Sequence, residues 1–156
     1  MRKYILSPVL LLLLVLGLNC SKNNGCSPRS VGSEAATIQA YAAANGISAI
    51  AHSSGLYYEI LTQGTGTTAS TNSNIYIRYT GKMLDGTTFD SQTNAAATGW
   101  PLNQLIEGWR IGIPLIQEGG HIRLIVPSSM AYGCTGYGGI PGNAILFFDI
   151  ELVDVQ

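Results

Sequence analysis

The chain has 156 residues, with 8 Lys and Arg, 9 Asp and Glu and a formal net charge of −1. This is the length of one ordinary domain. The composition, with 46% apolar and only 11% charged residues, excludes an intrinsically disordered protein. Nucleic-acid binding and attachment to a membrane surface through basic residues both need clustered Lys and Arg, so the charge pattern argues against both classes. The 19 Gly residues favour turn-rich β structure.

Residues 1–19 have the pattern of a signal peptide. Arg2 and Lys3 precede an unbroken aliphatic run from Val9 to Leu16, which is far shorter than the ~20 residues that span a bilayer. The run ends near Cys20 and resembles a bacterial lipoprotein signal, in which this thiol is acylated. We expect export and a lipid anchor at Cys20 in the cell envelope, in the periplasm or at the outer membrane. Ordinary secretion with a later cleavage is the alternative.

A short helix is predicted between this signal and the main domain. Residues 20–32 are polar with Gly and Pro, which indicates a flexible tether. In the extension at residues 33–54, Ser33 is the predicted N-cap, Glu34 lies in the first turn, and Asn45-Gly46 ends the helix. Because so short a helix is unstable alone in water, we expect it to dock on the main domain, with packing against a partner as the alternative.

From residue 55 to residue 156 the pattern is mainly that of β-strands. Alternating apolar residues predict strands at 56–60, 75–80, 121–126 and 146–152, and Asp85-Gly86 predicts a hairpin turn. A two-turn helix is predicted at 105–113, ending near Pro114. These elements predict an α+β domain in which an antiparallel sheet wraps around one short helix.

Nothing in the sequence has the spacing of a nucleophile motif, a phosphate-binding loop or a metal site. The glycine-rich segment at 136–139 precedes no predicted helix and contains no Lys, so the sequence predicts neither a cofactor nor a metal. Aromatic and Ile residues instead gather around Gly and Pro turns, and Asp90 directly follows Phe89. This pattern is typical of an apolar pocket with few polar anchors.

Four blocks of sequence together resemble the FKBP-type peptidyl-prolyl cis-trans isomerases. The blocks are Ile77–Ser91, Leu105–Trp109, Pro127–Gly133 and Leu146–Leu152, in the order and at the separations of that family. The resemblance implies an antiparallel, five- to six-stranded half-barrel sheet around the short helix. It also implies an enzyme that catalyses rotation of X–Pro bonds in exported proteins, with Pro-containing polypeptides as clients and macrolide inhibitors as further ligands.

The resemblance also assigns the site residues. It places the following at the pocket: Tyr79, Phe89, Trp109 as the floor, Tyr132, Phe148, Leu105 and Ile106 on one wall, Asp90 at the edge, and Ile140 as a cap. The Ile106 main-chain N–H and the Tyr132 hydroxyl would donate hydrogen bonds to substrate carbonyls. Without the resemblance, Trp109 and Phe148 read as core residues, and Asp90 as a turn cap.

The chain departs from the family pattern at a few positions. Thr98 replaces an aromatic residue that many members carry, although Trp100 keeps a neighbouring one, and Tyr137 lies where His is common. No Arg follows Asp90 to pair with it, which leaves the Tyr79 hydroxyl as the candidate partner. A non-catalytic envelope chaperone that binds Pro-containing segments is the alternative function, and a purely structural lipoprotein is a third.

The three cysteines suggest one disulfide. If Cys20 is acylated, Cys26 and Cys134 are the two remaining thiols of an exported chain, where disulfides persist. We predict a bond between them that folds the tether back beside the loop after Tyr132. Two unpaired thiols are the alternative.

Overall fold

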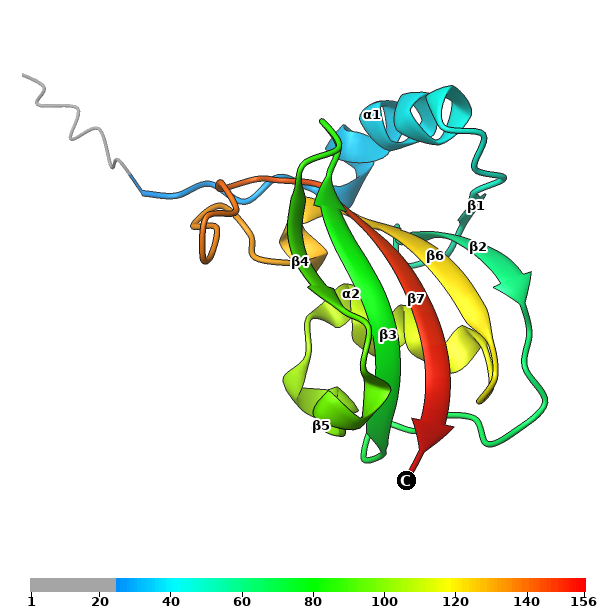
Figure 1. Cartoon of the computed structure of the whole chain (residues 1–156). Coiled ribbons are helices and arrows are strands. Elements are labelled where there is room, and N and C mark those ends of the chain that lie inside the picture. The colour runs from blue at the N-terminus through cyan, green and yellow to red at the C-terminus, as the bar shows by residue number, and fades with distance from the viewer. Residues whose placement is uncertain (1–24) are drawn as a thin grey trace, which may run out of the picture.

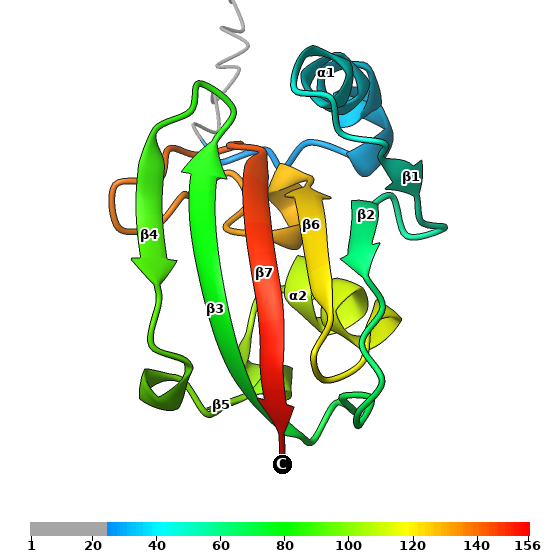
Figure 2. The same cartoon turned by 45° about the vertical axis from the view of Figure 1, so that its right-hand side comes forward.

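The computed structural model describes residues 25–156, so the expected signal peptide and Cys20 lie outside the described residues. An antiparallel sheet has the strand order β1-β2-β6-β7-β3-β4, with β5 paired to β3 (Figures 1 and 2). The strands are β1 (Ile50–Ala51), β2 (Tyr57–Thr62), β3 (Asn74–Met83), β4 (Thr88–Gln92), β5 (Trp100–Pro101), β6 (His121–Val126) and β7 (Leu146–Val155). The predicted strands and hairpin are present, and the two-residue strands β1 and β5 bring the sheet to seven.

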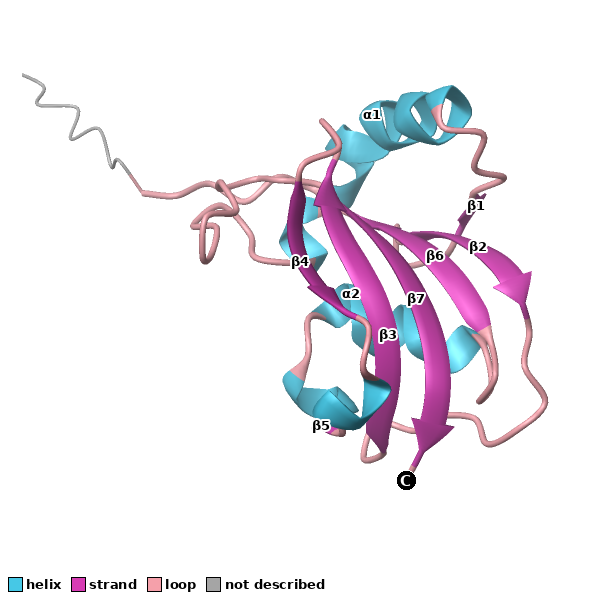
Figure 3. Cartoon of the chain, viewed as in Figure 1, coloured by secondary structure: helices cyan, strands magenta, loops and turns pink. Residues whose placement is uncertain are grey.

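The short helix α2 (Glu107–Gly112) lies against the inner side of the curved sheet (Figure 3). It approaches β6 closely because a Cβ at Gly108 would lie 2.5 Å from the Val126 side chain, and one at Gly112 would lie 2.7 Å from that of Leu124. The predicted span of 105–113 was too long at its start, since Ile106 is the N-cap. Beyond α2, the chain continues through a 3-10 turn that contains Pro114.

The central strands β3 and β7 supply the main core, as their alternation predicted. Ile75, Ile77 and Tyr79 of β3 are buried on the inner face. The inner face of β7 contributes Leu146, Phe148, Ile150 and Leu152, all at most 2% exposed. This packing fixes Tyr79 and Phe148 on the same inner face, in the part of the sheet that α2 covers.

The N-terminal helix α1 (Val31–Ala44) docks on the main domain, as predicted, and it does so on the outer face of the sheet. Ile38 and Ala42 pack in a second apolar cluster with Tyr57, Ile125 and Phe147. The outer faces of β6 and β7 are therefore buried at this end of the sheet. Phe147 is 9% exposed and Ile125 1%, since α1 covers them.

The start of α1 also corrects a prediction. Ser30 is the N-cap, and the hydroxyl of Ser33, the predicted cap, donates a 2.7 Å hydrogen bond to the Ser30 carbonyl from inside the first turn. The helix ends at Asn45-Gly46 as expected. None of the helices in residues 25–156 is long and apolar enough to cross a membrane.

Candidate active site

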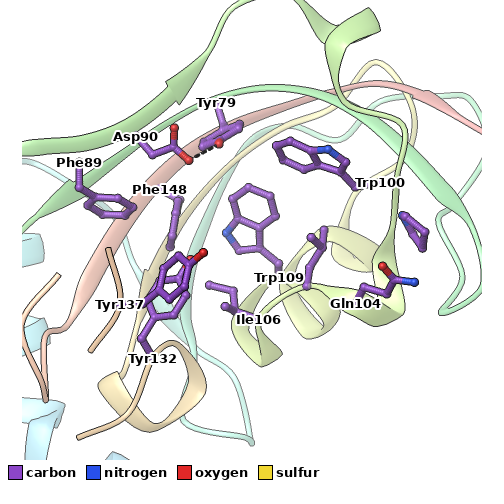
Figure 4. Close-up of a pocket in the computed structure, with 12 residues that line it drawn as sticks. Tyr79, Phe89, Asp90, Trp100, Gln104, Ile106, Trp109, Tyr132, Tyr137 and Phe148 are labelled. Atoms are coloured by element: carbon purple, nitrogen blue, oxygen red, sulfur yellow. Dashed lines mark hydrogen bonds between the residues drawn. The ribbon is translucent and has the colours of Figure 1, made fainter. Parts of the chain in front are cut away.

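A cavity of about 440 Å³ opens on the inner side of the sheet, beside α2 (Figure 4). This volume is within the range of small-molecule and peptide side-chain pockets. Strands β3, β4, β5 and β7, helix α2 and the loop after β6 all contribute to its wall. The lining residues are Tyr79, Phe89, Asp90, Trp100, Pro101, Gln104, Leu105, Ile106, Trp109, Tyr132, Tyr137 and Phe148.

Aromatic rings in edge-to-face contact form the floor. The ring centroid of Trp109 lies 5.1 Å from those of Tyr79 and Phe148, at interplanar angles of 79° and 80°. Phe89 meets Phe148 at 5.7 Å and 89°. Gly81 makes this possible, since a Cβ there would lie 2.7 Å from the Phe89 ring. Such edge-to-face pairs hold their rings in fixed orientations, so the floor is preformed and apolar.

One hydrogen bond connects this floor to a charge at the rim. The Tyr79 hydroxyl donates a 2.5 Å hydrogen bond to Oδ2 of Asp90. Tyr79 is the partner that the sequence analysis named for Asp90. Burial raises the pKa of Tyr79 well above its usual value, and the hydrogen bond and negative charge of Asp90 raise it further. Tyr79 therefore stays protonated at neutral pH and holds the carboxylate at the pocket edge.

Two donors of the pocket remain free to bind a ligand. Among the described residues, neither the Ile106 main-chain N–H nor the Tyr132 hydroxyl donates a hydrogen bond. Burial raises the pKa of Tyr132, as does the charge of Asp90, so this phenol also keeps its proton at neutral pH. A ligand with an apolar ring and carbonyl groups on either side of it could fill the pocket and accept from both donors.

The structure brings most of the predicted residues together, with one exception. Ile140 does not line the cavity; it is 7% exposed and belongs to the core. Its main chain exchanges hydrogen bonds of 2.8 and 3.0 Å with Tyr137. Tyr137, which is 70% exposed, stacks on Tyr132 with centroids 5.3 Å apart and takes the place at the pocket mouth predicted for Ile140.

Sequence reasoning missed Pro101 and Gln104 on the wall. Pro101 ends the two-residue strand β5 and Gln104 lies in the short 3-10 turn after it, and both elements are too short for a periodic pattern to show which way a side chain points. Thr98, the substituted aromatic position, does not line the cavity. Its Oγ1 accepts a 3.0 Å bond from the Ile77 N–H and donates a 2.6 Å bond to the Ala95 carbonyl, so it braces β3 instead.

Within residues 25–156, no cluster of three or more His, Cys, Asp or Glu residues could hold a metal ion. The Cα atoms of Cys26 and Cys134, the two cysteines of the predicted disulfide, lie 5.4 Å apart, with Cys134 in the loop that carries Tyr132. This separation is usual for a disulfide. The two residues are 108 positions apart in the sequence, so their proximity places the N-terminal segment beside the pocket loop.

Comparisons with known proteins agree with this geometry. Residues 65–153 match the family model described as FKBP-type peptidyl-prolyl cis-trans isomerase. An isomerase of this type from Aeromonas hydrophila, FkpA, is 40% identical over 104 residues, which is 66% of this chain and 39% of that protein. FkpA from Escherichia coli K12 is 38% identical over 105 residues, 67% of this chain and 39% of its own length. The match thus spans about two fifths of these relatives.

Solved structures show the same fold. The crystal structure of Escherichia coli FkpA superposes with a TM-score of 0.69 at 31% identity, over 81% of this chain and 61% of that one. A peptidyl-prolyl cis-trans isomerase from Pseudomonas syringae gives a TM-score of 0.67 at 28% identity, over 83% and 98%. The matched region contains β3 to β6, α2 and most of β7, and so all the residues that line the cavity. The chain belongs to the family of FKBP-type peptidyl-prolyl cis-trans isomerases.

Proposed function

We propose that this protein is a peptidyl-prolyl cis-trans isomerase, and that the aromatic cavity beside α2 is its active site. The observation that carries the proposal is the pairing of a preformed aromatic floor with two free donors, from Ile106 and Tyr132, in a chain of this family. The substrates are Pro-containing polypeptides, with the Pro ring in the cavity. Macrolide inhibitors would occupy the same cavity.

The chemistry needs no bond cleavage, and the pocket residues suit that demand. Rotation about an X–Pro bond is slow because the barrier of ~18–20 kcal/mol reflects lost amide resonance. The twisted amide is less polar in its C–N bond than the planar amide, so an apolar floor of Trp109, Tyr79 and Phe148 favours it relative to water. Hydrogen bonds from Ile106 and Tyr132 to the flanking carbonyls add stabilisation where they are stronger at the twisted geometry.

The experiment is a proline-isomerisation assay of the purified protein on a chromogenic tetrapeptide that contains one X–Pro bond. An accelerated cis-to-trans phase that scales with protein concentration supports the proposal. Folded protein that binds the peptide without changing this rate contradicts it and favours the non-catalytic chaperone. The assay therefore separates the two functions directly.

We further propose that the protein is exported and lipid-anchored through Cys20. The sequence of residues 1–20 supports this, since a basic start and a short aliphatic run precede the cysteine. Two or three acyl chains would anchor it stably, whereas one chain alone binds marginally. Metabolic labelling with an alkyne palmitate analogue should tag the wild-type protein and leave Cys20→Ala unlabelled. Equal labelling of Cys20→Ala would show that the anchor is elsewhere.

A disulfide between Cys26 and Cys134 is part of the same proposal, because an exported chain meets oxidising conditions. The Cα separation of 5.4 Å supports it. Peptide mapping without reductant should yield a linked peptide that contains both cysteines. Quantitative alkylation of both thiols in the unreduced protein would rule the bond out.

A further inference from the structure

The helix α1 carries a buried carboxylate that the family resemblance does not explain. Glu34 is 2% exposed, and it accepts two hydrogen bonds from a single residue, Ser128. Its Oε2 accepts from the Ser128 N–H at 2.8 Å, and its Oε1 accepts from the Ser128 hydroxyl at 2.7 Å. No Lys, Arg or His in the described part of the chain forms an ion pair with it. Burying a carboxylate costs free energy unless hydrogen bonds compensate for the lost water. The two hydrogen bonds from Ser128 therefore hold Glu34 in this position.

Ser128 connects Glu34 to the loop that carries Tyr132. Ser128 follows β6 and opens a 3-10 turn, and its carbonyl accepts hydrogen bonds from Ala131 N–H at 3.1 Å and from Gly133 N–H at 2.8 Å. These two donors flank Tyr132 in the chain. The N–H of Ser128 is thus held by α1, while its carbonyl holds the main chain on both sides of Tyr132.

A second connection reaches the same loop from the other side. Cys134, two residues after Tyr132, is joined to Cys26 in the segment that leads into α1. Figure 1 shows this blue N-terminal segment running beside the orange loop. The rest of α1 is fixed to the sheet through Ile38 and the cluster around Phe147. Tyr132 therefore lies between two attachments, at residues 128 and 134, to one docked element.

We infer that the N-terminal extension is a brace that positions Tyr132, with Glu34 as its principal positioning residue. The inference rests on the proposed function, because it assigns Glu34 an effect on isomerisation through the Tyr132 hydroxyl. The side-chain hydrogen bonds of Glu34 in the described part of the chain go to Ser128, which does not line the cavity. Its effect passes through Ser128 and the two hydrogen bonds that hold the main chain around Tyr132.

A double-mutant cycle tests this positioning role. Glu34→Ala should lower kcat/KM on the tetrapeptide by about 2- to 30-fold, the range of indirect coupling through packed and hydrogen-bonded residues. In the Tyr132→Phe background, Glu34→Ala should change kcat/KM by less than twofold, because the Tyr132 hydroxyl that Glu34→Ala would misplace is already absent. Glu34→Gln and Ser128→Ala, which each remove part of the contact, should give intermediate losses even if Glu34→Ala unfolds. Thr37→Ala, at an exposed position of the same helix, is the control and should leave kcat/KM unchanged.

Amide hydrogen exchange, read by NMR, provides a readout that does not depend on catalysis. Glu34→Ala should speed exchange at Ala131 and Gly133, which flank Tyr132, and leave exchange in the middle of β6 unchanged. If the loss of kcat/KM is equal in both backgrounds, or absent in folded Glu34→Ala, the positioning role is refuted. A folded wild-type protein with no isomerase activity would refute the proposed function instead. In that case the amide exchange rates alone would test whether α1 positions the Tyr132 loop. Unchanged exchange at Ala131 and Gly133 in Glu34→Ala would overturn the brace.

Discussion

The Tyr79 hydroxyl donates a hydrogen bond of 2.5 Å to the Asp90 carboxylate, and this contact joins the buried floor of the pocket to its exposed rim. Tyr79 lies on the central strand β3, and Asp90 lies on the neighbouring edge strand β4. The pair fixes a negative charge beside a cavity lined mainly by aromatic and aliphatic side chains. Removing this hydrogen bond should change both the electrostatic potential in the pocket and the orientation of the Tyr79 ring.

Asp90→Val should lower kcat/KM by about three- to tenfold, since a part-buried charged hydrogen bond is worth less than a fully buried one. The fold should be retained, because Asp90 lies at the surface. Asp85→Asn is the matched control, an exposed acidic residue in the turn between the same two strands. Full activity of a folded Asp90→Val protein, measured in the tetrapeptide assay, would remove Asp90 from the site.

Tyr132→Phe removes one hydroxyl from the wall of the cavity without changing the ring. A catalytic hydrogen bond is worth on the order of 1–3 kcal/mol, so kcat/KM should fall by about five- to a hundredfold. Tyr137→Phe, which alters the exposed ring stacked on it, is the comparison. Its activity should stay within twofold of wild type. Equal effects of the two substitutions would mean that the Tyr132 hydroxyl has no special role.

Alkaline pH should destabilise the protein through Tyr79. Its pKa is raised in the folded state by burial and by Asp90, whereas in the unfolded chain it titrates near 10. Above pH ~10 the unfolded state therefore binds fewer protons, and the unfolding free energy falls as pH rises, by up to about 1.4 kcal/mol per pH unit from this group. Urea titrations at pH 9 and pH 11 should show that the free energy of unfolding falls less in Tyr79→Phe than in the wild-type protein. An identical fall in both proteins would contradict the raised pKa of Tyr79 as its cause.

Phe148→Ala should cost both stability and activity. Phe148 is 2% exposed and contacts the rings of Trp109 and Phe89, so the substitution leaves a cavity in the floor and should destabilise by about 3–5 kcal/mol. Chemical denaturation gives the stability, and the tetrapeptide assay, corrected for folded fraction, gives the activity. Phe147→Ala, on the α1 side of the same strand, should cost stability but lower the activity of the folded fraction less than Phe148→Ala does, because it loosens the docking of α1 and leaves the floor rings in place.

Reduction of the Cys26–Cys134 bond should lower the midpoint of thermal unfolding. The chain-entropy model gives roughly 4–5 kcal/mol for a loop as long as this one, and measured gains are often smaller. Cys26→Ser with Cys134→Ser should behave like the reduced protein, and adding reductant should not change it further. If reductant shifts the midpoint of this double variant as much as that of the wild type, the disulfide is not the cause.

The sequence was informative where local periodicity and a known motif coincide. Alternation predicted strands β3 and β7, and because the period of a strand is two, burying one face places Ile77 and Phe148 on the inner side of the sheet. The motif blocks then assigned the aromatic floor and the partner of Asp90. These features depend on neighbours in the chain or on a pattern shared by a family.

The features that sequence reasoning missed depend on long-range docking. Glu34 reads as a solvated acid in a first helical turn, and only the position of α1 over the end of β6 buries it against Ser128. The same docking covers Phe147 and Ile125. Tyr137 rather than Ile140 lies at the pocket mouth, because the glycine-rich segment that contains Tyr137 and precedes Ile140 has no periodicity that fixes side-chain direction.

The place of β7 in the sheet has a consequence for the order of folding. This strand follows every other strand in the chain, yet it lies between β6 and β3 and pairs with both. Until it arrives, β3 and β4 can form a hairpin on one side, and β1, β2 and β6 a separate ribbon on the other, with no backbone bonds joining the two. The sheet therefore cannot close progressively as the chain emerges. A polypeptide that ends before Leu146 would leave two strand edges exposed and open to pairing with other chains.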